Sequence, residues 1–250
     1  MILRYTETGF LVILQEDDPD KIVDFMLETN YDKEFCVSLD FAPEFIAGLM
    51  EAGFLVMSAQ FDEPKNGDDE TAAPDENPTE NGTYCLPLPK LHLVRSALFF
   101  DNLHVKKSIR RYLGRYELRP DVDFDFILNR CLEIHGEEWL TPPLVAAIRD
   151  IRRNGYRGVY PTSFALYRDG KPVAGEFGVK VGRVYTSYSG YYDESNSGTV
   201  QLILTTRYLR ENGFAFFDLG MPLDYKNDLG AVDITPEEFV RVFRLGRDKT

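Results

Sequence analysis

The stretch that decides the fold is residues 162–189, with the sequence TSFALYRDGKPVAGEFGVKVGRVYTSYS. Apolar and polar residues alternate in three runs, 162–167, 172–181 and 184–189, and this two-residue period is typical of β-strands. The dipeptides Asp169-Gly170 and Gly182-Arg183 separate the runs at positions that suit tight turns. The stretch therefore predicts three consecutive antiparallel strands.

A helix and a further strand are predicted directly after these three strands. Residues 198–212 carry apolar side chains at helical spacing, Gly213 ends the helix, and 214–219 is an apolar strand. This order resembles the core of the GNAT acyltransferases, in which neighbouring strands splay apart to admit an acyl donor. The coenzyme A signature of that superfamily, Q/R-x-x-G-x-G/A, is replaced here by SNSGTV at 195–200. A coenzyme A donor is therefore disfavoured, although an acyl-CoA N-acyltransferase stays an alternative.

The rest of the chain predicts a smaller amino-terminal part and several more helices. We expect a hairpin over 1–14, helices that begin at Asp18-Pro19 and Ala42-Pro43, and further helices over 104–113, 121–134 and 141–154. Residues 62–83 contain no large apolar side chain and predict an acidic surface loop, and a capping box at 235–238 opens the last helix. These features predict an α+β protein with an amino-terminal α/β domain over 1–100 and a GNAT-like domain over 101–250.

Charge is unevenly distributed along the chain. The formal net charge of the 250 residues is −13, but residues 1–90 hold 20 acidic and 5 basic side chains, whereas residues 91–250 hold 21 and 23. An acidic average therefore does not exclude RNA as a partner. Lys106, Lys107, Arg110 and Arg111 pair at i,i+4 on one predicted helix. Such a face suits contacts with RNA phosphates, and an ordinary solvated surface is the alternative.

The cysteines and histidines give no sign of a metal or disulfide site. The chain has three of each, without a C-x-x-C pair or a metal-ligand spacing. No apolar run approaches the roughly 20 residues of a membrane span, and the first residues lack the pattern of a signal peptide. We expect a cytoplasmic protein with no membrane partner, no metal and no cofactor.

Several short motifs resemble the bacterial leucyl/phenylalanyl-tRNA–protein transferases, and they occur in the order of that family. DNLHVKKSIRR at 101–111 resembles the family's LH-x-S-R-S helix, and VAGEFGV at 173–179 resembles its V-G-G-x-Y-G-V strand. The other matching segments lie at 40–54, 87–90, 138–140, 155–156, 217–218, 229–231 and 235–239. The resemblance implies transfer of an aminoacyl group from charged tRNA to the α-amine of an acceptor protein, a mark for degradation.

The resemblance also implies roles for individual residues. Asp218 and Tyr225 take the places of the family's aspartate in D-x-Q and of a downstream histidine, and both are expected to be catalytic. Trp139 corresponds to a residue that stacks near the terminal adenosine of the tRNA, with a core position as the alternative. The basic helix is expected to bind tRNA. The expected substrate-binding set is Trp139, Gly175, Glu176, Phe177, Gly178, Ser187, Tyr188 and Ser189.

Three positions depart from the family pattern at this expected site. Ser187 stands where the family has the glutamate of its donor site, Gly220 replaces the glutamine of D-x-Q, and Glu176 occupies an apolar position. We therefore expect a donor other than leucine or phenylalanine, because a buried carboxylate beside an apolar side chain would be costly. A non-catalytic protein that binds tRNA or peptide amino termini is a further alternative.

Overall fold

A computed structural model describes residues 2–62 and 82–248 of the chain. Helices and strands are mixed along the sequence, which confirms the predicted α+β class. The helices are α1 Pro19–Glu28, α2 Pro43–Glu51, α3 Lys107–Leu113, α4 Phe124–His135, α5 Pro142–Asn154, α6 Ser197–Glu211, α7 Asp224–Asp228 and α8 Pro236–Arg247, with a short 3-10 helix at Phe100–Asn102. The strands are β1 Arg4–Tyr5, β2 Leu11–Ile13, β3 Val37–Ser38, β4 Leu55–Asp62, β5 Thr83–Lys90, β6 Arg95–Leu98, β7 Glu117–Pro120, β8 Val159–Arg168, β9 Lys171–Val181, β10 Val184–Tyr192, β11 Phe216–Gly220 and β12 Val232–Ile234.

A seven-stranded sheet with the order β12-β6-β11-β10-β9-β8-β7 forms the centre of the molecule. The three predicted strands are β8, β9 and β10, and they pair antiparallel as expected. Helix α6 then returns the chain so that β11 lies parallel to β10. The sequence of three strands, a helix and a strand is therefore confirmed, and one parallel pair lies inside an otherwise antiparallel sheet.

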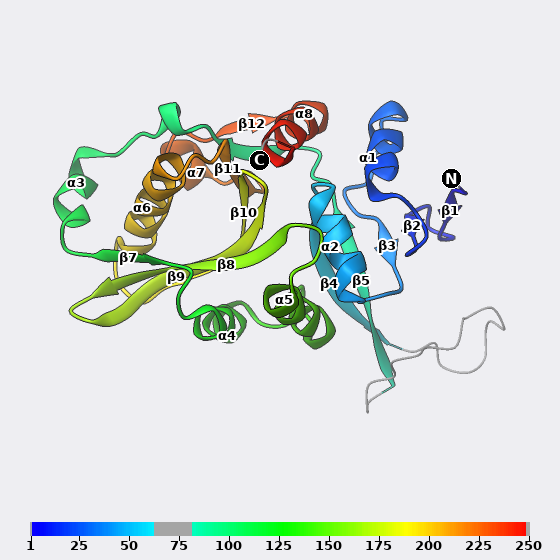
Figure 1. Cartoon of the computed structure of the whole chain (residues 1–250), viewed down its shortest axis with the longest axis horizontal. Coiled ribbons are helices and arrows are strands. Elements are labelled where there is room, and N and C mark those ends of the chain that lie inside the picture. The colour runs from blue at the N-terminus through cyan, green and yellow to red at the C-terminus, as the bar shows by residue number, and fades with distance from the viewer. Residues whose placement is uncertain (1, 63–81, 249–250) are drawn as a thin grey trace.

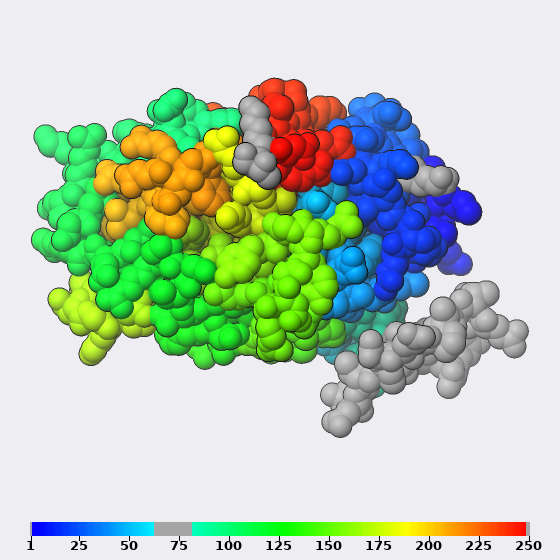
Figure 2. All heavy atoms as spheres, viewed as in Figure 1, coloured from blue at the N-terminus to red at the C-terminus, as the bar shows by residue number. Residues whose placement is uncertain are grey.

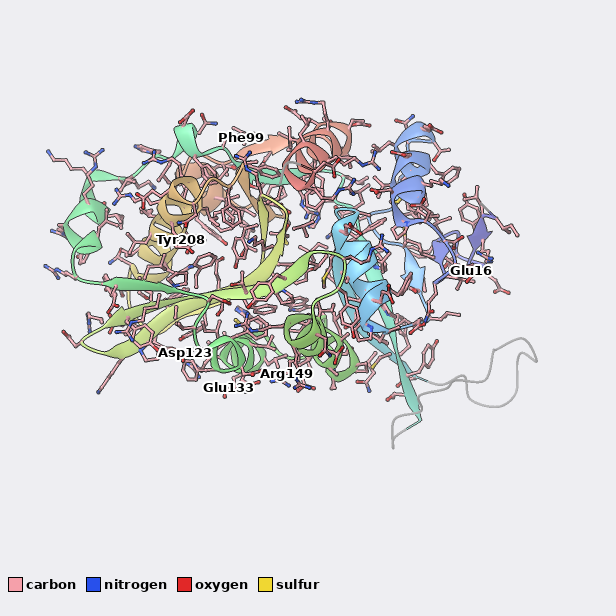
Figure 3. All side chains as sticks on the ribbon, viewed as in Figure 1. Glu16, Phe99, Asp123, Glu133, Arg149 and Tyr208 are labelled. Carbon is pink, nitrogen blue, oxygen red and sulfur yellow. The ribbon has the colours of Figure 1, made fainter. Side chains whose placement is uncertain are left out.

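Helices cover both faces of this sheet (Figure 1). Helices α4 and α5 lie on one face, where Ile127 and Ile148 are fully buried, and α6 lies on the other. Tyr208 of α6 lies against the sheet, with its ring edge-on to Phe164 of β8 at 5.5 Å between centroids (Figure 3). The apolar spacing in the sequence thus places one stripe of each helix in the core.

Two aspartates shift the start of α4 from its predicted position. The sequence predicts a helix from residue 121, but Asp121 and Asp123 have φ values of 57° and 55°. Residues in this left-handed region cannot continue a right-handed helix, so α4 begins at Phe124. The helix predicted over 104–113 begins at Lys107, because Lys106 before it has a non-helical ψ of 138°.

The amino-terminal part contains the predicted hairpin and both predicted helices. β1 pairs antiparallel with β2, Asp18 caps α1 through its side chain, and α2 begins at Pro43. β4 and β5 form a second hairpin, in which Asp62 pairs with Thr83. These two residues are the ends of the predicted acidic loop, and 63–81 lie outside the described residues.

The predicted domain boundary at residue 100 falls just after a strand of the central sheet. β6 precedes that boundary, yet it pairs antiparallel with both β11 and β12. Phe239 and Phe243 of α8 also pack closely around Gly53 at the end of α2. The two predicted parts therefore share a sheet and a core, and the division at residue 100 stays a prediction.

Candidate functional site

The pairing of β10 with β11 ends near the middle of the central sheet. The two strands pair from Val184 with Phe216 to Thr186 with Asp218 and not beyond. Directly after this point the register of β10 shifts against β9 between Ser187 and Ser189. Because side chains alternate along a strand, Thr186 and Ser187 point to opposite faces of the sheet. Each face carries a buried carboxylate at this place.

The first carboxylate, Asp218, is fully buried and accepts four hydrogen bonds. Arg95 of β6 donates two of them, from Nε to Oδ1 at 2.8 Å and from Nη2 to Oδ2 at 2.6 Å. The hydroxyl of Thr186 donates at 2.8 Å and the amide N–H of Gly220 at 3.0 Å. These donors occupy both carboxylate oxygens, so an amine would have to displace one of them. The catalytic role expected for Asp218 stays a prediction.

Arg95 contacts a histidine and an aromatic ring as well as Asp218. It was not predicted from the sequence. Its side chain is 1% exposed, its Nη1 donates to Nδ1 of His92 at 2.8 Å, and its guanidinium lies 4.2 Å from the ring centroid of Phe239. Burial, followed by the charge of Arg95, lowers the pKa of His92 to about 2. His92 is therefore neutral and acts as an acceptor at Nδ1. The sequence did contain one sign of a buried arginine, because Arg95 directly precedes the mostly apolar run SALFF at 96–100.

The second carboxylate, Glu176 of β9, lies on the other face and has only neutral donors. Glu176 is 2% exposed. Ser187 Oγ donates to Oε2 at 2.7 Å, and Gln201 Nε2 of α6 donates to Oε1 at 2.9 Å. Burial raises the pKa of Glu176 to about 7, against the lowering effect of these hydrogen bonds and of the Lys226 charge. This carboxyl group can therefore take up and release a proton near neutral pH.

Helix α7 adds a lysine and a tyrosine beside Glu176. Lys226 Nζ donates to the carbonyl oxygens of Leu219 at 2.6 Å and Met221 at 2.7 Å, and burial lowers its pKa to about 8. Tyr225 is 52% exposed, and partial burial, followed by the nearby Glu176 charge, raises its pKa. The structure thus places Tyr225, predicted to be catalytic, at the solvent side of this group.

A tyrosine with an unpaired hydroxyl lies next to Glu176 within the described part of the chain. Tyr185 of β10 is fully buried, and its hydroxyl has no hydrogen-bond partner among residues 2–62 and 82–248. Gly178 makes room for it, because a Cβ there would lie 2.8 Å from that hydroxyl and 2.1 Å from the carbonyl oxygen of Thr186. Gly178 is therefore required for this packing, and substitution by alanine would force the two strands apart.

The expected substrate-binding set is divided between the two faces of the sheet. Glu176, Gly178 and Ser187 lie on the α6 face. Gly175 faces Ile127 of α4, where an added Cβ would lie 3.1 Å from the isoleucine side chain. The same face holds Phe177, which packs on Phe124, Tyr188, whose hydroxyl accepts from the amide of Val56 at 3.1 Å, and Ser189, which hydrogen-bonds Cys131.

Trp139 lies in the loop between α4 and α5, beside Ser58 of β4. Its side chain is partly buried against the core, and its carbonyl accepts from the amide of Ser58 at 2.9 Å. The Thr141 hydroxyl donates to Ser58 at 2.8 Å instead of capping α5. A surface hollow of about 520 Å³ lies nearby between α4 and α5 and includes Leu140 in its lining. Figure 3 shows Arg149, another lining residue, pointing outward from α5.

The basic helix α3 lies at the end of the molecule opposite to residues 2–14 (Figure 2). Lys106 precedes the helix and forms an ion pair with Asp228 of α7 at 2.5 Å. Among the described residues, Lys107, Arg110 and Arg111 have no acidic partner. Arg110 donates to the carbonyl of Val105 and Arg111 to the hydroxyl of Tyr112. Three of the four predicted basic residues therefore keep their charge free for an anion.

No metal site and no membrane helix can be assigned within the described ranges. Residues 2–62 and 82–248 contain no group of three or more histidine, cysteine, aspartate or glutamate side chains that could hold a metal ion. None of their helices is both long enough and apolar enough to cross a bilayer.

Comparison with known proteins assigns the family. The sequence model of the leucyl/phenylalanyl-tRNA protein transferases matches residues 97–244, more than half of the chain. The chain belongs to this family. The family predicted from the sequence is thereby confirmed, and Glu176, Ser187, Gln201 and Asp218 all lie within the matched region.

Individual relatives carry the same description. The leucyl/phenylalanyl-tRNA–protein transferase of Rubrobacter xylanophilus is 30% identical over 149 residues, which is 59% of this chain and 76% of that protein. The one of Pseudomonas entomophila is 27% identical over 150 residues, which is 58% of this chain. The chain spans 65% of the length of the latter. Among solved structures, the crystal structure of FemX aligns with 93% of this chain and 81% of the FemX chain, at 9% sequence identity. The TM-score of 0.47 is too low to identify the fold.

Proposed function

We propose that this protein transfers an aminoacyl group from aminoacyl-tRNA to the amino terminus of an acceptor protein. The observation that carries the proposal is the family match over residues 97–244, which contains the place where β10 and β11 stop pairing between two buried carboxylates. In this proposal the carboxyl-terminal part is a GNAT-like aminoacyltransferase domain, the protein acts in the cytoplasm, and the transferred residue marks the acceptor for degradation.

The chemistry of this transfer fits the groups at the site. Aminoacyl-tRNA is already an activated ester, so an enzyme must position it, stabilise the developing oxyanion and accept a proton from the amine. The edge of β10 beyond Thr186 has no partner in β11 and can present backbone groups to the ester. Glu176, with a pKa of about 7, is suited to the proton transfer. None of these steps requires a metal or a cofactor.

The two predicted catalytic residues take different roles in this proposal. Asp218 acts through the groups it binds: it fixes Thr186 and Gly220 where the strands separate, and is a positioning residue. Tyr225 is half-exposed beside Glu176 and contacts the donor through its hydroxyl. Trp139 stacks on the terminal adenosine, and Lys106, Lys107, Arg110 and Arg111 contact tRNA phosphates.

The donor preference follows from the position of the carboxylate. Ser187 replaces the family's glutamate, but Glu176 on the neighbouring strand places a carboxyl group within 2.7 Å of the Ser187 hydroxyl. The family's carboxylate is thus absent from β10, and a carboxyl group stands instead on β9, at a position where the family has an apolar residue. We infer a donor with a polar or basic side chain rather than leucine or phenylalanine, because such a side chain can compensate the buried charge.

A transfer assay tests the proposed function. The purified protein is incubated with a mixed pool of charged tRNAs and a peptide with an amino-terminal arginine or lysine, and mass spectrometry records mass additions to the peptide. A single-residue addition with a polar or basic amino acid is expected. Addition of leucine alone would contradict the donor preference. Binding of tRNA without any addition would contradict the transferase activity and favour a non-catalytic binder.

The tRNA surface is tested by the salt dependence of binding. Each phosphate contact contributes about 0.7 to 0.9 to the slope of log affinity against log salt. Replacing Lys107, Arg110 and Arg111 by alanine should therefore reduce that slope by about 2. Replacing Lys106 should matter less, because its charge is already paired with Asp228. Lys171, at the start of β9, is an exposed control. An equal effect of Lys171→Ala and the triple replacement would leave α3 without a role.

A further inference from the structure

We propose that Ser187 is a nucleophile that carries the aminoacyl group as a serine ester, with Glu176 as its base. This inference rests on the proposed aminoacyl transfer and adds a covalent intermediate to it. It starts from one contact, the 2.7 Å hydrogen bond from Ser187 Oγ to Glu176 Oε2.

The contacts around this pair have the arrangement of an activated nucleophile. Such a site needs a hydroxyl within hydrogen-bond distance of a base, and a third group that orients the base. Glu176 is the base, and Gln201 orients it by donating to Oε1 at 2.9 Å. Gln201 is itself fixed, because Nε2 also donates to the hydroxyl of Thr205 at 2.9 Å. The carboxylate therefore presents Oε2 to Ser187 in a fixed position.

Ser187 is accessible to a substrate, whereas its base, Glu176, is shielded from solvent. Ser187 is partly exposed, whereas Glu176 is 2% exposed. Ser187 also directly follows Thr186, the last residue of β10 that pairs with β11. In this proposal the ester carbonyl binds beside the unpaired edge of β10, where Ser187 Oγ attacks it and backbone groups of that edge stabilise the developing oxyanion.

The titratable surroundings of Glu176 favour proton uptake by this group rather than by a neighbour. The titratable groups that influence Glu176 are Lys226 and Tyr225 on α7, Tyr185 on β10 and, on the opposite face of the sheet, Cys131 on α4. Lys226 is held by two carbonyl oxygens, and burial raises the pKa values of the tyrosines and of the cysteine. Cys131, with a pKa of about 12, is a thiol at neutral pH and is a poor nucleophile.

The two half-reactions balance without any further reactant. Ser187 Oγ attacks the ester carbonyl carbon of the aminoacyl-tRNA while its proton passes to Glu176 Oε2. The bond between that carbon and the ribose oxygen breaks, and the ribose oxygen takes the proton as the tRNA leaves. The acceptor amine then attacks the carbonyl carbon of aminoacyl-Ser187. The bond to Oγ breaks, Glu176 accepts the amine proton, and Oγ receives it back, leaving an amide.

The decisive experiment omits the acceptor. The protein is mixed with charged tRNA, quenched in acid, and analysed by intact-mass and peptide mass spectrometry. The expected result is the mass of one aminoacyl residue on the peptide that contains Ser187, together with a burst of free tRNA stoichiometric with protein. Ser187→Ala should lose the adduct and lower the rate of transfer by about 100-fold or more, as when an activated nucleophile is removed. Ser195→Ala, an exposed loop serine before α6, should keep both.

Two further variants distinguish a catalytic pair of Ser187 and Glu176, here called the dyad, from a hydrogen bond that is only structural. Ser187→Cys should still form an adduct, now as a thioester that hydroxylamine cleaves rapidly. In wild type the burst rate should rise with pH until about 7 because Glu176 must be ionised, and this dependence should disappear in Glu176→Gln. If wild type transfers aminoacyl groups without an adduct, and Ser187→Ala transfers equally fast, the dyad is wrong and the proposed function stands. If wild type transfers nothing from any charged tRNA, the proposed function itself fails.

Discussion

The two buried carboxylates at the centre of the sheet differ in the charge of their partners. Asp218 faces a guanidinium, a hydroxyl and an amide, and its ion pair with Arg95 is 2.6 Å long with both side chains at most 1% exposed. Glu176, on the opposite face, is bound by a hydroxyl and a side-chain amide, which carry no charge. Both carboxyl groups are buried, but only Asp218 contacts a positively charged side chain.

In the proposed mechanism this difference corresponds to a positioning role for Asp218 and a proton-transferring role for Glu176. A buried carboxylate with a bidentate arginine fixes the strands that its partners belong to. Burial raises the pKa of Glu176, which has only neutral donors, to about 7, so both of its protonation states are populated near neutral pH. Family resemblance alone emphasises Asp218 as the catalytic group. The catalytic role of Asp218 stays a prediction, our proposal assigns the proton transfer to Glu176, and the following variants measure the contrast.

Asp218→Asn should produce the largest loss of stability. The variant leaves Arg95 buried without a carboxylate, and breaking a buried ion pair by removing one partner costs about 3–5 kcal/mol. Glu176→Gln should cost about 1 kcal/mol, because it exchanges hydrogen bonds without stranding a charge. Urea denaturation followed by circular dichroism measures both. The double variant Arg95→Met/Asp218→Leu should recover much of the loss, since neither charge is then present. Equal losses for Asp218→Asn and Glu176→Gln would show that the two carboxylates do not differ in this way.

The free energy of unfolding should change with pH in opposite directions for the two faces of the sheet. Glu176 has its pKa raised from 4.5 to about 7, so between these values the folded state holds a proton that the unfolded state has released, and stability falls as pH rises. His92, beside Arg95, has its pKa lowered from 6.5 to about 2, so the unfolded state binds the extra proton and stability rises with pH up to 6.5. Between pH 4.5 and 6.5 the two slopes oppose each other.

Single variants should uncover each slope in turn. Each slope is limited to about 1.4 kcal/mol per pH unit. Glu176→Gln should leave the rising slope of His92, and His92→Gln, whose amide oxygen can still accept from Arg95, should leave the falling slope of Glu176. Denaturation curves at half-unit intervals from pH 4.5 to 7.5 measure these changes, and a His92→Gln/Glu176→Gln double variant gives the background from other groups. A rising slope in His92→Gln would contradict the raised pKa of Glu176.

Sequence reasoning located the strands of the site but not the partners of its charges. The alternation in 162–189 was long enough to predict β8, β9 and β10, and the same pattern showed Glu176 as a charge inside a buried strand. β6 has only four residues, too short for a periodic signal. Its Arg95 lies 123 positions from Asp218, so nothing local in either segment indicated the ion pair. The placement of Ser187 and Ser189 on opposite faces was also hidden, because the register shift between them reverses the alternation.

The smallest expected effects come from Thr186 and Ser187, which are consecutive in β10 and point to opposite faces. Thr186→Val removes one of four hydrogen bonds to Asp218 and nearly preserves the side-chain shape, so the free energy of unfolding should fall by about 1–2 kcal/mol. Ser187→Ala removes one hydrogen bond to Glu176, a group that can hold a proton instead, and should cost less than about 1 kcal/mol.

Transfer activity should follow the opposite order in this pair. Ser187→Ala should reduce the rate of transfer strongly although the variant is nearly as stable as wild type, whereas Thr186→Val should reduce activity only in proportion to the folded protein that it loses. Denaturation and transfer assays on the same preparations provide both values. If the rate falls with stability along one line for both variants, the α6 face has no chemical role beyond packing, because a structural hydrogen bond affects activity only through the fold. A large loss of activity in fully folded Thr186→Val would instead assign the chemistry to the Asp218 face.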